Sequence, residues 1–305
     1  MPLVSRAEFH AQSHQNDLLN YARLRRLASD AGAFVFDGGY VFDSVYRTIT
    51  ELGVPGVWVR RGLWQAGQDN SVALDREKIF SRVIVPTEAF DELNQTLSQG
   101  DHLRPVGPIV QKLSLGSARK SELRKLLADQ VGRPFDRLVV TMLGGGVAAD
   151  RSAQSIAVAA ECERHAGVLN LVVVWPTATV EPGLFDWQNT RVFKTHHASA
   201  LVAVADLFVS AVGYNSFHEA LYNQVPSIFI PQMAKFMDDQ AARAEAAAER
   251  EVATVVAPEN IFQLQQEIAA HLAGKSEDIR TRLTELTLPD PGNIAAARII
   301  EELQV

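Results

Sequence analysis

The sequence predicts an α/β protein made of two domains, each built around a parallel β-sheet. Short apolar runs rich in β-branched residues alternate with longer helix-like segments along most of the chain. Glycine-containing turns directly follow several of these runs. The 305 residues are enough for about two domains of ordinary size, each with its own core. Because short strands separated by helices imply right-handed crossovers, we expect doubly wound sheets.

The first half of the chain opens with a helix that carries the basic cluster Arg23-Leu24-Arg25-Arg26. Strand and helix patterns then alternate. A proline-containing stretch after them resembles a connector between domains. In chain order we expect helix Glu8–Ala31, strand Ala33–Phe36, helix Val41–Leu52, strand Val54–Val59, strand Val83–Val85 and connector Pro105–Gln111.

The second half repeats the alternation more clearly and without irregular gaps. We expect strand Leu138–Leu143, helix Ser152–His165, strand Leu169–Trp175, strand Val192–Phe193, helix Ser199–Ala205, strand Leu207–Ser210, helix Ser216–Tyr222, strand Ser227–Ile230 and helix Ala241–Glu249. Near the end, Pro289-Asp290-Pro291-Gly292 breaks the chain before a last amphipathic helix, Ile294–Leu303. The predicted divisions are therefore 1–115, 116–288 and 289–305, the last packing on the first.

Composition argues against a disordered or fibrous protein. Hydrophobic residues make up 47% and charged residues 21%, which is ordinary for a globular protein. The formal net charge of -7 argues against nucleic acid as a partner, because phosphate backbones attract a surplus of Lys and Arg.

The single cysteine, Cys162, excludes an internal disulfide and fits a reducing compartment. We expect it to be a small apolar side chain on a helix. No apolar run approaches the roughly 20 residues that span a bilayer. The expected location is therefore cytoplasmic, with any membrane contact peripheral at the inner face.

Ligands of open parallel sheets bind beyond the carboxyl ends of the strands, so the turns there carry the functional prediction. Gly144-Gly145-Gly146 follows the strand Leu138–Leu143. Its amides and the following helix N-terminus could receive a diphosphate. A tight strand-to-helix turn explains the glycines equally well, because their spacing is not that of the dinucleotide fingerprint.

A more specific series begins after the strand Leu207–Ser210 with Gly213-Tyr214-Asn215-Ser216 and Glu219, and it ends at Asp239-Gln240. Donors on Asn215 and Ser216, together with a helix N-terminus, suit a nucleotide phosphate. A carboxylate at Glu219 would accept from both ribose hydroxyls. Asp239 and Gln240 could bind sugar hydroxyls in the same way.

Each member of the series also has a purely structural interpretation. Ser216 and Glu219 form Ser-x-x-Glu, a capping box that stabilises a helix start without a ligand. Asp238 is a candidate N-cap. It is the order of the whole series, rather than any one residue, that favours a binding site.

This series resembles the donor domain of the GT-B glycosyltransferases, which include the MurG-like N-acetylglucosaminyltransferases and the UDP-glycosyltransferases. The resemblance runs from Leu138 onward and implies a GT-B-like fold with two Rossmann-like domains. It implies that Asn215 and Ser216 lie at the donor phosphates, that Glu219 holds the ribose and that Asp239-Gln240 hold the sugar. The remaining donor-binding positions that it implies are Gly144, Gly145, Phe193, Lys194, Gly213 and Tyr214.

In these families the backbone near the position of Phe193-Lys194 contacts the uracil. One position departs from the family pattern. Ala211 stands where plant members place a phosphate-binding histidine, although the MurG-like branch also lacks that histidine.

The first half resembles the acceptor side of the MurG-like branch through Asp37-Gly38-Gly39-Tyr40-Val41 and Gly53-Val54-Pro55. In plant members an aspartate at the position of Asp37 orients a catalytic histidine on a glycine-rich loop nearer the N-terminus. That loop should precede Glu8 and is missing. The acceptor domain is therefore expected to be incomplete, either through truncation or because another chain supplies the missing half.

The catalytic groups are less clear than the donor-binding residues. The resemblance to the plant members makes Asp37 the catalytic candidate. The residues offer no candidate for the base itself, since His10 and His14 lie on a polar N-terminal helix and His218 points off the binding face. The adjacent His196-His197 pair lacks a third ligand at a recognisable spacing, so we expect no metal and no other cofactor.

Arg60-Arg61, after a predicted strand, either faces an anionic acceptor or is solvated surface charge. The residues leave both interpretations open.

The predicted function is transfer of a sugar, N-acetylglucosamine being one candidate, from a UDP-sugar to a lipid-linked or polysaccharide acceptor. Two alternatives remain open. A nucleotide-sugar hydrolase of the same fold would use water in place of the acceptor. A non-catalytic subunit would bind the nucleotide sugar and need a partner chain.

Overall fold

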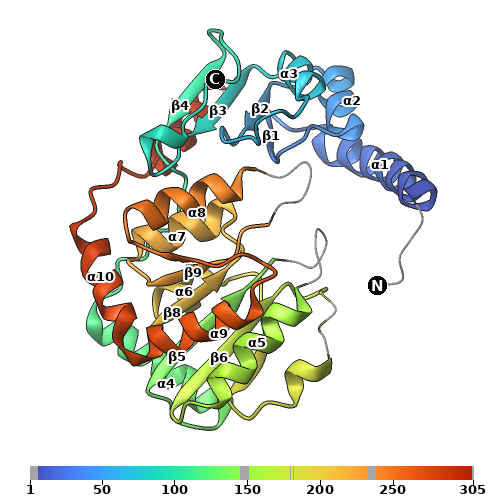
Figure 1. Ribbon diagram of the computed structural model, residues 1–305. Coiled ribbons are helices and arrows are strands. Elements are labelled where there is room, and N and C mark those ends of the chain that lie inside the picture. The colour runs from blue at the N-terminus through green and yellow to red at the C-terminus, as the bar shows by residue number, and fades with distance from the viewer. Residues whose placement is uncertain (1–5, 145–150, 179, 181, 233–237, 304–305) are drawn as a thin grey trace. The chain divides into compact units, whose positions relative to one another are not determined.

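The computed structural model describes residues 6–144, 151–178, 180, 182–232 and 238–303. The chain divides into two compact units, each an α/β structure (Figure 1). Residues 1–109 and 289–305 form the N-terminal unit, and residues 110–288 form the C-terminal unit. The chain therefore passes from one unit to the other twice.

The N-terminal unit contains a four-stranded parallel sheet in the order β1-β2-β3-β4. This sheet is smaller than that of the C-terminal unit, which is consistent with the predicted incomplete N-terminal domain. Its strands are β1 (Phe34–Asp37), β2 (Gly56–Val59), β3 (Arg82–Pro86) and β4 (Leu103–Val106). Its helices are α1 (Arg6–Ala28), α2 (Asp43–Leu52), α3 (Ser71–Glu77) and α11 (Asn293–Glu301), with a short 3-10 helix at Asp91–Leu93.

Strand β4 includes Pro105, where the sequence suggested a connector. Pro105 pairs with Val85 of β3, and β4 is the last strand at its side of the described sheet. Proline has no N–H to donate, and an edge strand tolerates that loss. The connector interpretation was therefore wrong for Pro105 and Val106.

The sheet of the N-terminal unit is covered on both faces. One core joins β2 and β3 to α2 and α3 and contains Trp58, Val83, Val45, Ile49 and Ala73. The other face packs on α11 through Val57, Ile84, Val106 and Ala296, with Ile299, Ile300 and Leu303 partly buried against them. The C-terminal residues of the chain thus complete the core that the N-terminal residues begin.

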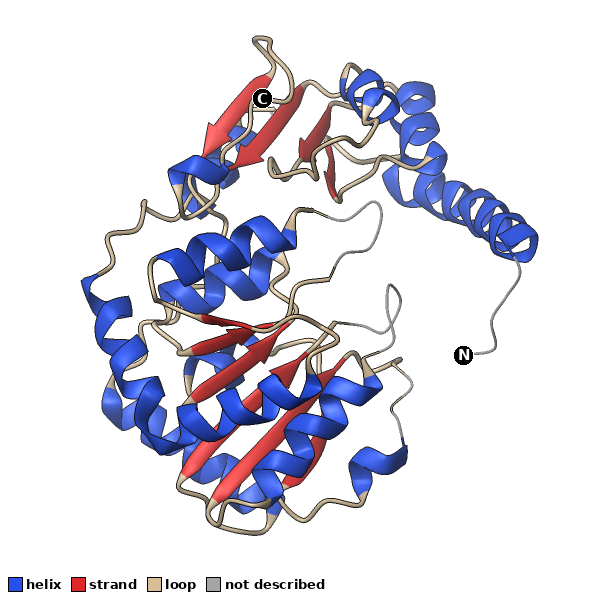
Figure 2. Ribbon diagram, viewed as in Figure 1, coloured by secondary structure: helices blue, strands red, loops and turns tan. Residues whose placement is uncertain are grey.

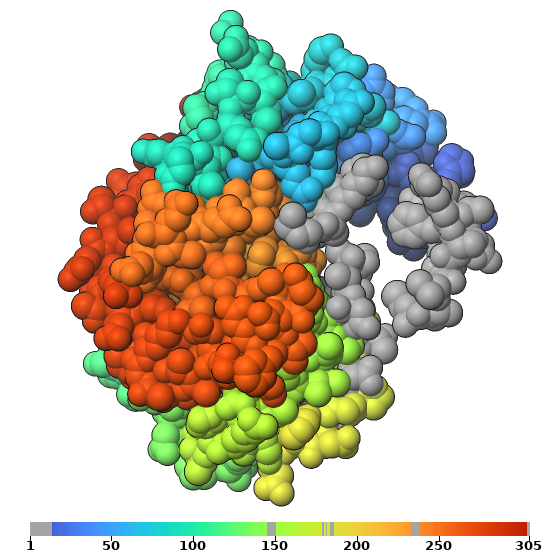
Figure 3. Space-filling model, viewed as in Figure 1, coloured from blue at the N-terminus to red at the C-terminus, as the bar shows by residue number. Residues whose placement is uncertain are grey.

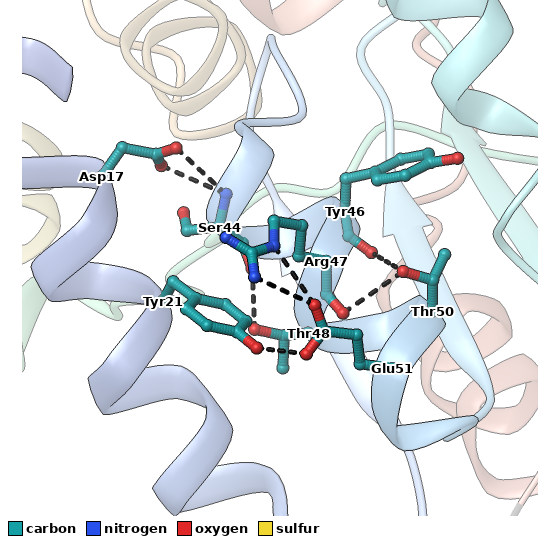
Figure 4. A network of polar contacts seen from close by, with 8 residues as sticks. All are labelled: Asp17, Tyr21, Ser44, Tyr46, Arg47, Thr48, Thr50 and Glu51. Atoms are coloured by element: carbon teal, nitrogen blue, oxygen red, sulfur yellow. Dashed lines mark hydrogen bonds and ion pairs between the residues drawn. The ribbon is translucent and has the colours of Figure 1, made fainter.

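Polar contacts fix α1 against α2 (Figure 4). The Asp17 carboxylate accepts from the Ser44 backbone N–H at 3.2 Å, at the N-terminus of α2, where the helix dipole favours a negative charge. The Tyr21 hydroxyl donates to Glu51. The Arg47 guanidinium lies 4.1 Å from the centre of the Tyr21 ring and pairs with Glu51 at 3.1 Å.

The C-terminal unit contains a six-stranded parallel sheet in the order β10-β9-β8-β5-β6-β7, with helices on both faces (Figure 2). Its strands are β5 (Arg137–Met142), β6 (Val168–Val174), β7 (Thr190–Lys194), β8 (Leu207–Ser210), β9 (Ser227–Phe229) and β10 (Thr254–Val255). Its helices are α4 (Ser117–Val131), α5 (Ser152–Glu163), α6 (Ser199–Ala203), α7 (Tyr214–Tyr222), α8 (Gln240–Glu249), α9 (Ile261–Ala270) and α10 (Ser276–Glu285), with a 3-10 helix at Pro182–Phe185 and a π turn at His271–Lys275.

Helices α5 and α9 share one face of this sheet. Their apolar residues, among them Val158, Cys162, Leu264 and Ile268, pack with Val209 and other strand residues in one buried cluster. In Figure 3, residues of α5 in yellow-green and of α9 in orange-red lie side by side on the visible face. Cys162 is buried on α5 as predicted, and burial raises the pKa of its thiol, so it is an inert packing residue.

No helix in the described part of the chain is long and apolar enough to span a membrane.

The last helix of the N-terminal unit depends on two close-packed glycines. The Gly292 N–H donates to the Pro108 carbonyl at 2.9 Å. A Cβ added to Gly292 would lie 2.0 Å from the Gly107 oxygen, and one added to Gly107 would lie 2.1 Å from the Asp290 oxygen. Only residues without a side chain fit at these two positions.

Gly292→Ala should therefore lower the free energy of unfolding by about 1–3 kcal/mol, because backbone must shift to admit the methyl group. Urea unfolding followed by circular dichroism measures this. Gly32→Ala is the matched control, since a Cβ there meets nothing within 4 Å. Equal stability of the two variants would contradict the role of Gly292.

A buried histidine links the end of α9 to β10 and α10. The His271 ring contacts the Thr254 hydroxyl through Nε2 and the Ser276 hydroxyl through Nδ1, both at 3.0 Å. Burial, with a smaller contribution from Lys275, lowers the pKa of His271 from 6.5 to about 4. The imidazole is therefore neutral in the folded protein at neutral pH.

Since the unfolded chain binds this proton more readily, the stabilisation is complete above pH 6.5 and is lost as the pH falls towards 4. At pH 5 the loss should approach about 2 kcal/mol. Unfolding free energies of the wild type and of His271→Gln at pH 7 and pH 5 test this. The wild type should lose more stability than the variant, and parallel losses would contradict the assignment.

Candidate functional site

The strand order of the C-terminal unit changes direction between β5 and β8. The chain proceeds from β5 to β6 and β7 on one side, and then returns to place β8 on the other side of β5. Loops leaving the carboxyl ends of two such strands diverge, and the crevice between them is where open α/β sheets bind ligands. Here the Ala211 N–H donates to the Met142 carbonyl at 3.2 Å, so the loops start side by side.

The loop after β8 turns sharply into α7. Val212 is fully buried and has φ of 58°, which is rare and strained for a β-branched residue. Its N–H donates to the Ser210 hydroxyl at 3.2 Å. Gly213 then caps the helix in an extended conformation, and its carbonyl accepts from the Phe217 N–H at 2.9 Å.

Helix α7 therefore begins at Tyr214, two residues before the sequence placed it. Ser216 lies inside the first turn and is not the N-cap, so the capping-box interpretation of Ser216 and Glu219 was wrong. The N–H groups of Asn215 and Ser216 belong to the first turn, which has no helical carbonyl four residues back. They are suited to a negatively charged ligand.

Helix α7 has a buried face and an open face. The buried side chains are Tyr214, Phe217, His218, Ala220, Leu221 and Tyr222. Asn215 is exposed, and Ser216 and Glu219 are half-buried. Glu219 lies four residues after Asn215 and three after Ser216, so all three side chains share one face of the helix. His218 is excluded as a base, since it is fully buried with Nδ1 2.7 Å from the Tyr214 carbonyl oxygen.

Glu219 connects α7 to α6. Its Oε1 accepts from the Ser199 hydroxyl at 2.8 Å. Burial raises the pKa of the Glu219 carboxyl, and the bond from Ser199 opposes that effect. A half-buried carboxylate with one oxygen already bonded can still accept from a ligand hydroxyl.

Gly144 leaves β5 with φ of 92°, a conformation that favours glycine. The carbonyl of the preceding Leu143 accepts from the Gln232 side chain at 3.0 Å. Gly145 and Gly146, the rest of the predicted phosphate turn, lie outside the described residues.

The start of α8 holds Asp239 and Gln240, the two residues of the predicted sugar site, with Asp238 just before them. Asp238 pairs with Arg243, whose side chain is fully buried. Asp239 is the N-cap of α8 and accepts from the Ala242 N–H at 3.0 Å, so the prediction of Asp238 as N-cap was wrong by one residue. Gln240 is only 3% exposed, and its Oε1 accepts from the Gln232 backbone N–H at 2.9 Å.

The carboxyl ends of β6 and β7 carry an aromatic pair that the sequence reasoning missed. Trp175 is exposed, and its ring meets that of His196 edge to face at 4.9 Å. Phe193 is half-buried at the end of β7, and Lys194 Nζ donates to the Ala178 carbonyl at 3.1 Å. The predicted strand included Trp175, whereas β6 ends at Val174, so the exposure of the Trp175 ring could not be predicted.

The described residues contain no group of three His, Cys, Asp or Glu that could hold a metal ion.

In the N-terminal unit, Asp37 ends β1 with an exposed side chain.

Arg60, one residue beyond β2, is buried, at 2% exposure. Its Nη1 lies 2.7 Å from Glu77 of α3, and the other oxygen of Glu77 lies 3.0 Å from His102. Arg60 is therefore neither solvated nor turned to an acceptor, so both interpretations of it were wrong, while Arg61 is half-buried.

Arg60→Met should lower the free energy of unfolding by about 3–5 kcal/mol, because it removes the guanidinium that compensates the buried Glu77 charge and leaves only His102 beside it. The double variant Arg60→Met/Glu77→Leu removes both charges and should recover most of this loss. Guanidinium unfolding of both variants makes the comparison. A double variant no more stable than Arg60→Met would show that the pair is not the source of the effect.

The fold is that of the GT-B glycosyltransferases. Three solved structures share it: Acinetobacter baumannii MurG (16% identity, 94% of this chain and 77% of that one, TM-score 0.52), the spinosyn rhamnosyltransferase SpnG with thymidine diphosphate (17%, 95% and 79%, 0.55), and Phytolacca americana UGT2 with UDP-2-fluoro-glucose and pterostilbene (16%, 100% and 84%, 0.56). No curated protein sequence matches the chain.

Residues 139–285, most of the C-terminal unit, match the family described as glycosyltransferase family 28 C-terminal domain. Together with the fold, this match confirms the resemblance to MurG-like and UDP-dependent glycosyltransferases. The match supports sugar transfer as the class of reaction.

Proposed function

We propose that the C-terminal unit binds a UDP-sugar at the carboxyl ends of β5 and β8, and that the protein transfers its sugar to an acceptor hydroxyl. The observation that supports this most is the open face of α7. Asn215, Ser216 and Glu219 are its polar side chains, and they lie at the point where the strand order reverses. The family match over residues 139–285 covers this helix.

In this proposal the diphosphate lies at the N-terminus of α7. The N–H groups of Asn215 and Ser216, together with their side chains, donate to its oxygens. These same donors stabilise the charge that develops on the leaving nucleoside diphosphate. They are fixed before the ligand arrives, because Gly213 and the buried Val212 hold the turn.

The ribose and the sugar extend in two directions from the diphosphate. Glu219 accepts from the ribose hydroxyls, with Ser199 orienting its carboxylate. Asp239, partly exposed at the start of α8, accepts from the sugar. Phe193 and Lys194, at the end of β7, lie on the side of the sheet that the base would occupy.

Asp37 is proposed as the catalytic carboxylate on the acceptor side. An inverting transfer needs a group that accepts the proton of the attacking hydroxyl, either directly or through an oriented base. Asp37 is exposed at the carboxyl end of β1. Asp37→Asn should lower kcat and leave UDP affinity unchanged, because Asp37 takes part in proton transfer from the acceptor and does not contact the donor.

Calorimetry with UDP tests the donor site directly. Glu219→Ala should raise the Kd for UDP about tenfold or more, since a hydrogen bond to a charged group contributes roughly 1.5–3 kcal/mol. Glu259→Ala is the control, because Glu259 is exposed in the same unit. Thymidine diphosphate should bind more weakly than UDP. Failure of the wild type to bind UDP at millimolar concentration would overturn the proposal.

Turnover assays then separate transfer from its alternatives. The wild type is incubated with UDP-N-acetylglucosamine or UDP-glucose, and with a lipid-linked sugar or a polysaccharide as acceptor. Transfer that is unchanged by EDTA is the expected result. Release of free sugar without acceptor would identify a hydrolase, and tight UDP binding without turnover would identify a binding subunit that needs a partner chain.

A further inference from the structure

Two buried glutamines lie at the ends of the segment between β9 and α8 in the C-terminal unit. Gln232 follows β9 and is 5% exposed, and Gln240 opens α8. The sheet order β9-β8-β5 places the loop that follows β9 next to those that follow β8 and β5. The diphosphate site of the proposed function lies between the loop that follows β8 and the loop that follows β5.

The two side chains act in series. Gln240 Oε1 accepts from the Gln232 backbone N–H at 2.9 Å. Gln232 Nε2 donates in turn to the Leu143 carbonyl at 3.0 Å, one residue before Gly144. A buried amide that loses its partner keeps the cost of its desolvation. The first bond therefore resists separation of Gln232 from Gln240 at the two ends of the segment between β9 and α8, and the second resists separation of that segment from the loop after β5.

The same two amides reach the glycine turns on either side of the site. A Cβ added to Gly144 would lie 2.8 Å from Gln232 Nε2. A Cβ added to Gly213 would lie 3.9 Å from Gln240 Nε2. Gly144 therefore lies against Gln232 and Gly213 lies near Gln240, and the Gln240 side chain is bonded to the Gln232 backbone.

We propose that Gln232 and Gln240 are positioning residues, which hold the turns at Gly144 and Gly213 at the separation that the donor diphosphate requires. This rests on the proposed function. Resemblance to known transferases assigned Gln240 to the donor sugar instead. Its burial and its bond to Gln232 favour the positioning role and leave Asp239 as the side chain that contacts the sugar.

UDP separates these two roles, because it carries the diphosphate but no sugar. Gln240→Met removes the acceptor oxygen, and Gln240→Glu retains one. We expect Gln240→Met to raise the Kd for UDP about three- to tenfold, the loss of one hydrogen bond, and Gln240→Glu to restore most of the affinity. If both variants bind UDP as the wild type does and lose affinity only for the UDP-sugar, Gln240 is a sugar contact and the inference is wrong.

Hydrogen exchange of the unliganded protein tests the bracing independently of any ligand. In Gln232→Met, peptides covering residues 138–144 should exchange faster than in the wild type, and in Gln240→Met so should peptides covering residues 211–217. Gln266→Met, an exposed position on α9, should leave both unchanged. Unchanged exchange in Gln232→Met would overturn the inference. A wild type that does not bind UDP would count against the proposed function alone, because the exchange result would still decide the bracing.

Discussion

The reversal of strand order between β5 and β8 is the constraint on which the candidate site depends. Parallel strands end at the same edge of a sheet, so β5 and β8 deliver their loops to one place, and the reversal carries the following helices to opposite faces. A ligand can therefore enter between the loops without displacing core side chains. Every residue proposed to bind the donor phosphates follows one of these two strands. The site is thus a consequence of topology first and of residue identity second.

Helix α7 shows how the core and the site share one element. Its apolar and aromatic residues are committed to the interior, and this fixes the rotation of the helix about its axis. Once that rotation is set, Asn215, Ser216 and Glu219 have only one direction to face. The positive φ of Val212 is the local cost of bringing the helix N-terminus to the strand end. Burial of the Val212 side chain offsets that strain.

Sequence reasoning predicted the elements well where periodicity was strong, as for β8, whose bounds it gave correctly as Leu207–Ser210. It missed the start of α7 because the extended Gly213 and the strained Val212 have no local signature. It missed β4 because proline argues against a strand unless the strand is known to be at an edge. The burial of Arg60 depends on Glu77 and His102, which are distant in sequence. The engagement of Gln240 by Gln232 likewise becomes visible only in three dimensions.

The position of α11 has a consequence for how the protein is made. One face of the N-terminal sheet is completed only by residues that follow the whole C-terminal unit. On the ribosome, Val57, Ile84 and Val106 therefore remain without their final partners until the last helix emerges. An exposed apolar face of this kind is a target for chaperones and a risk for association between nascent chains. The C-terminal unit is continuous in sequence and has no such delay.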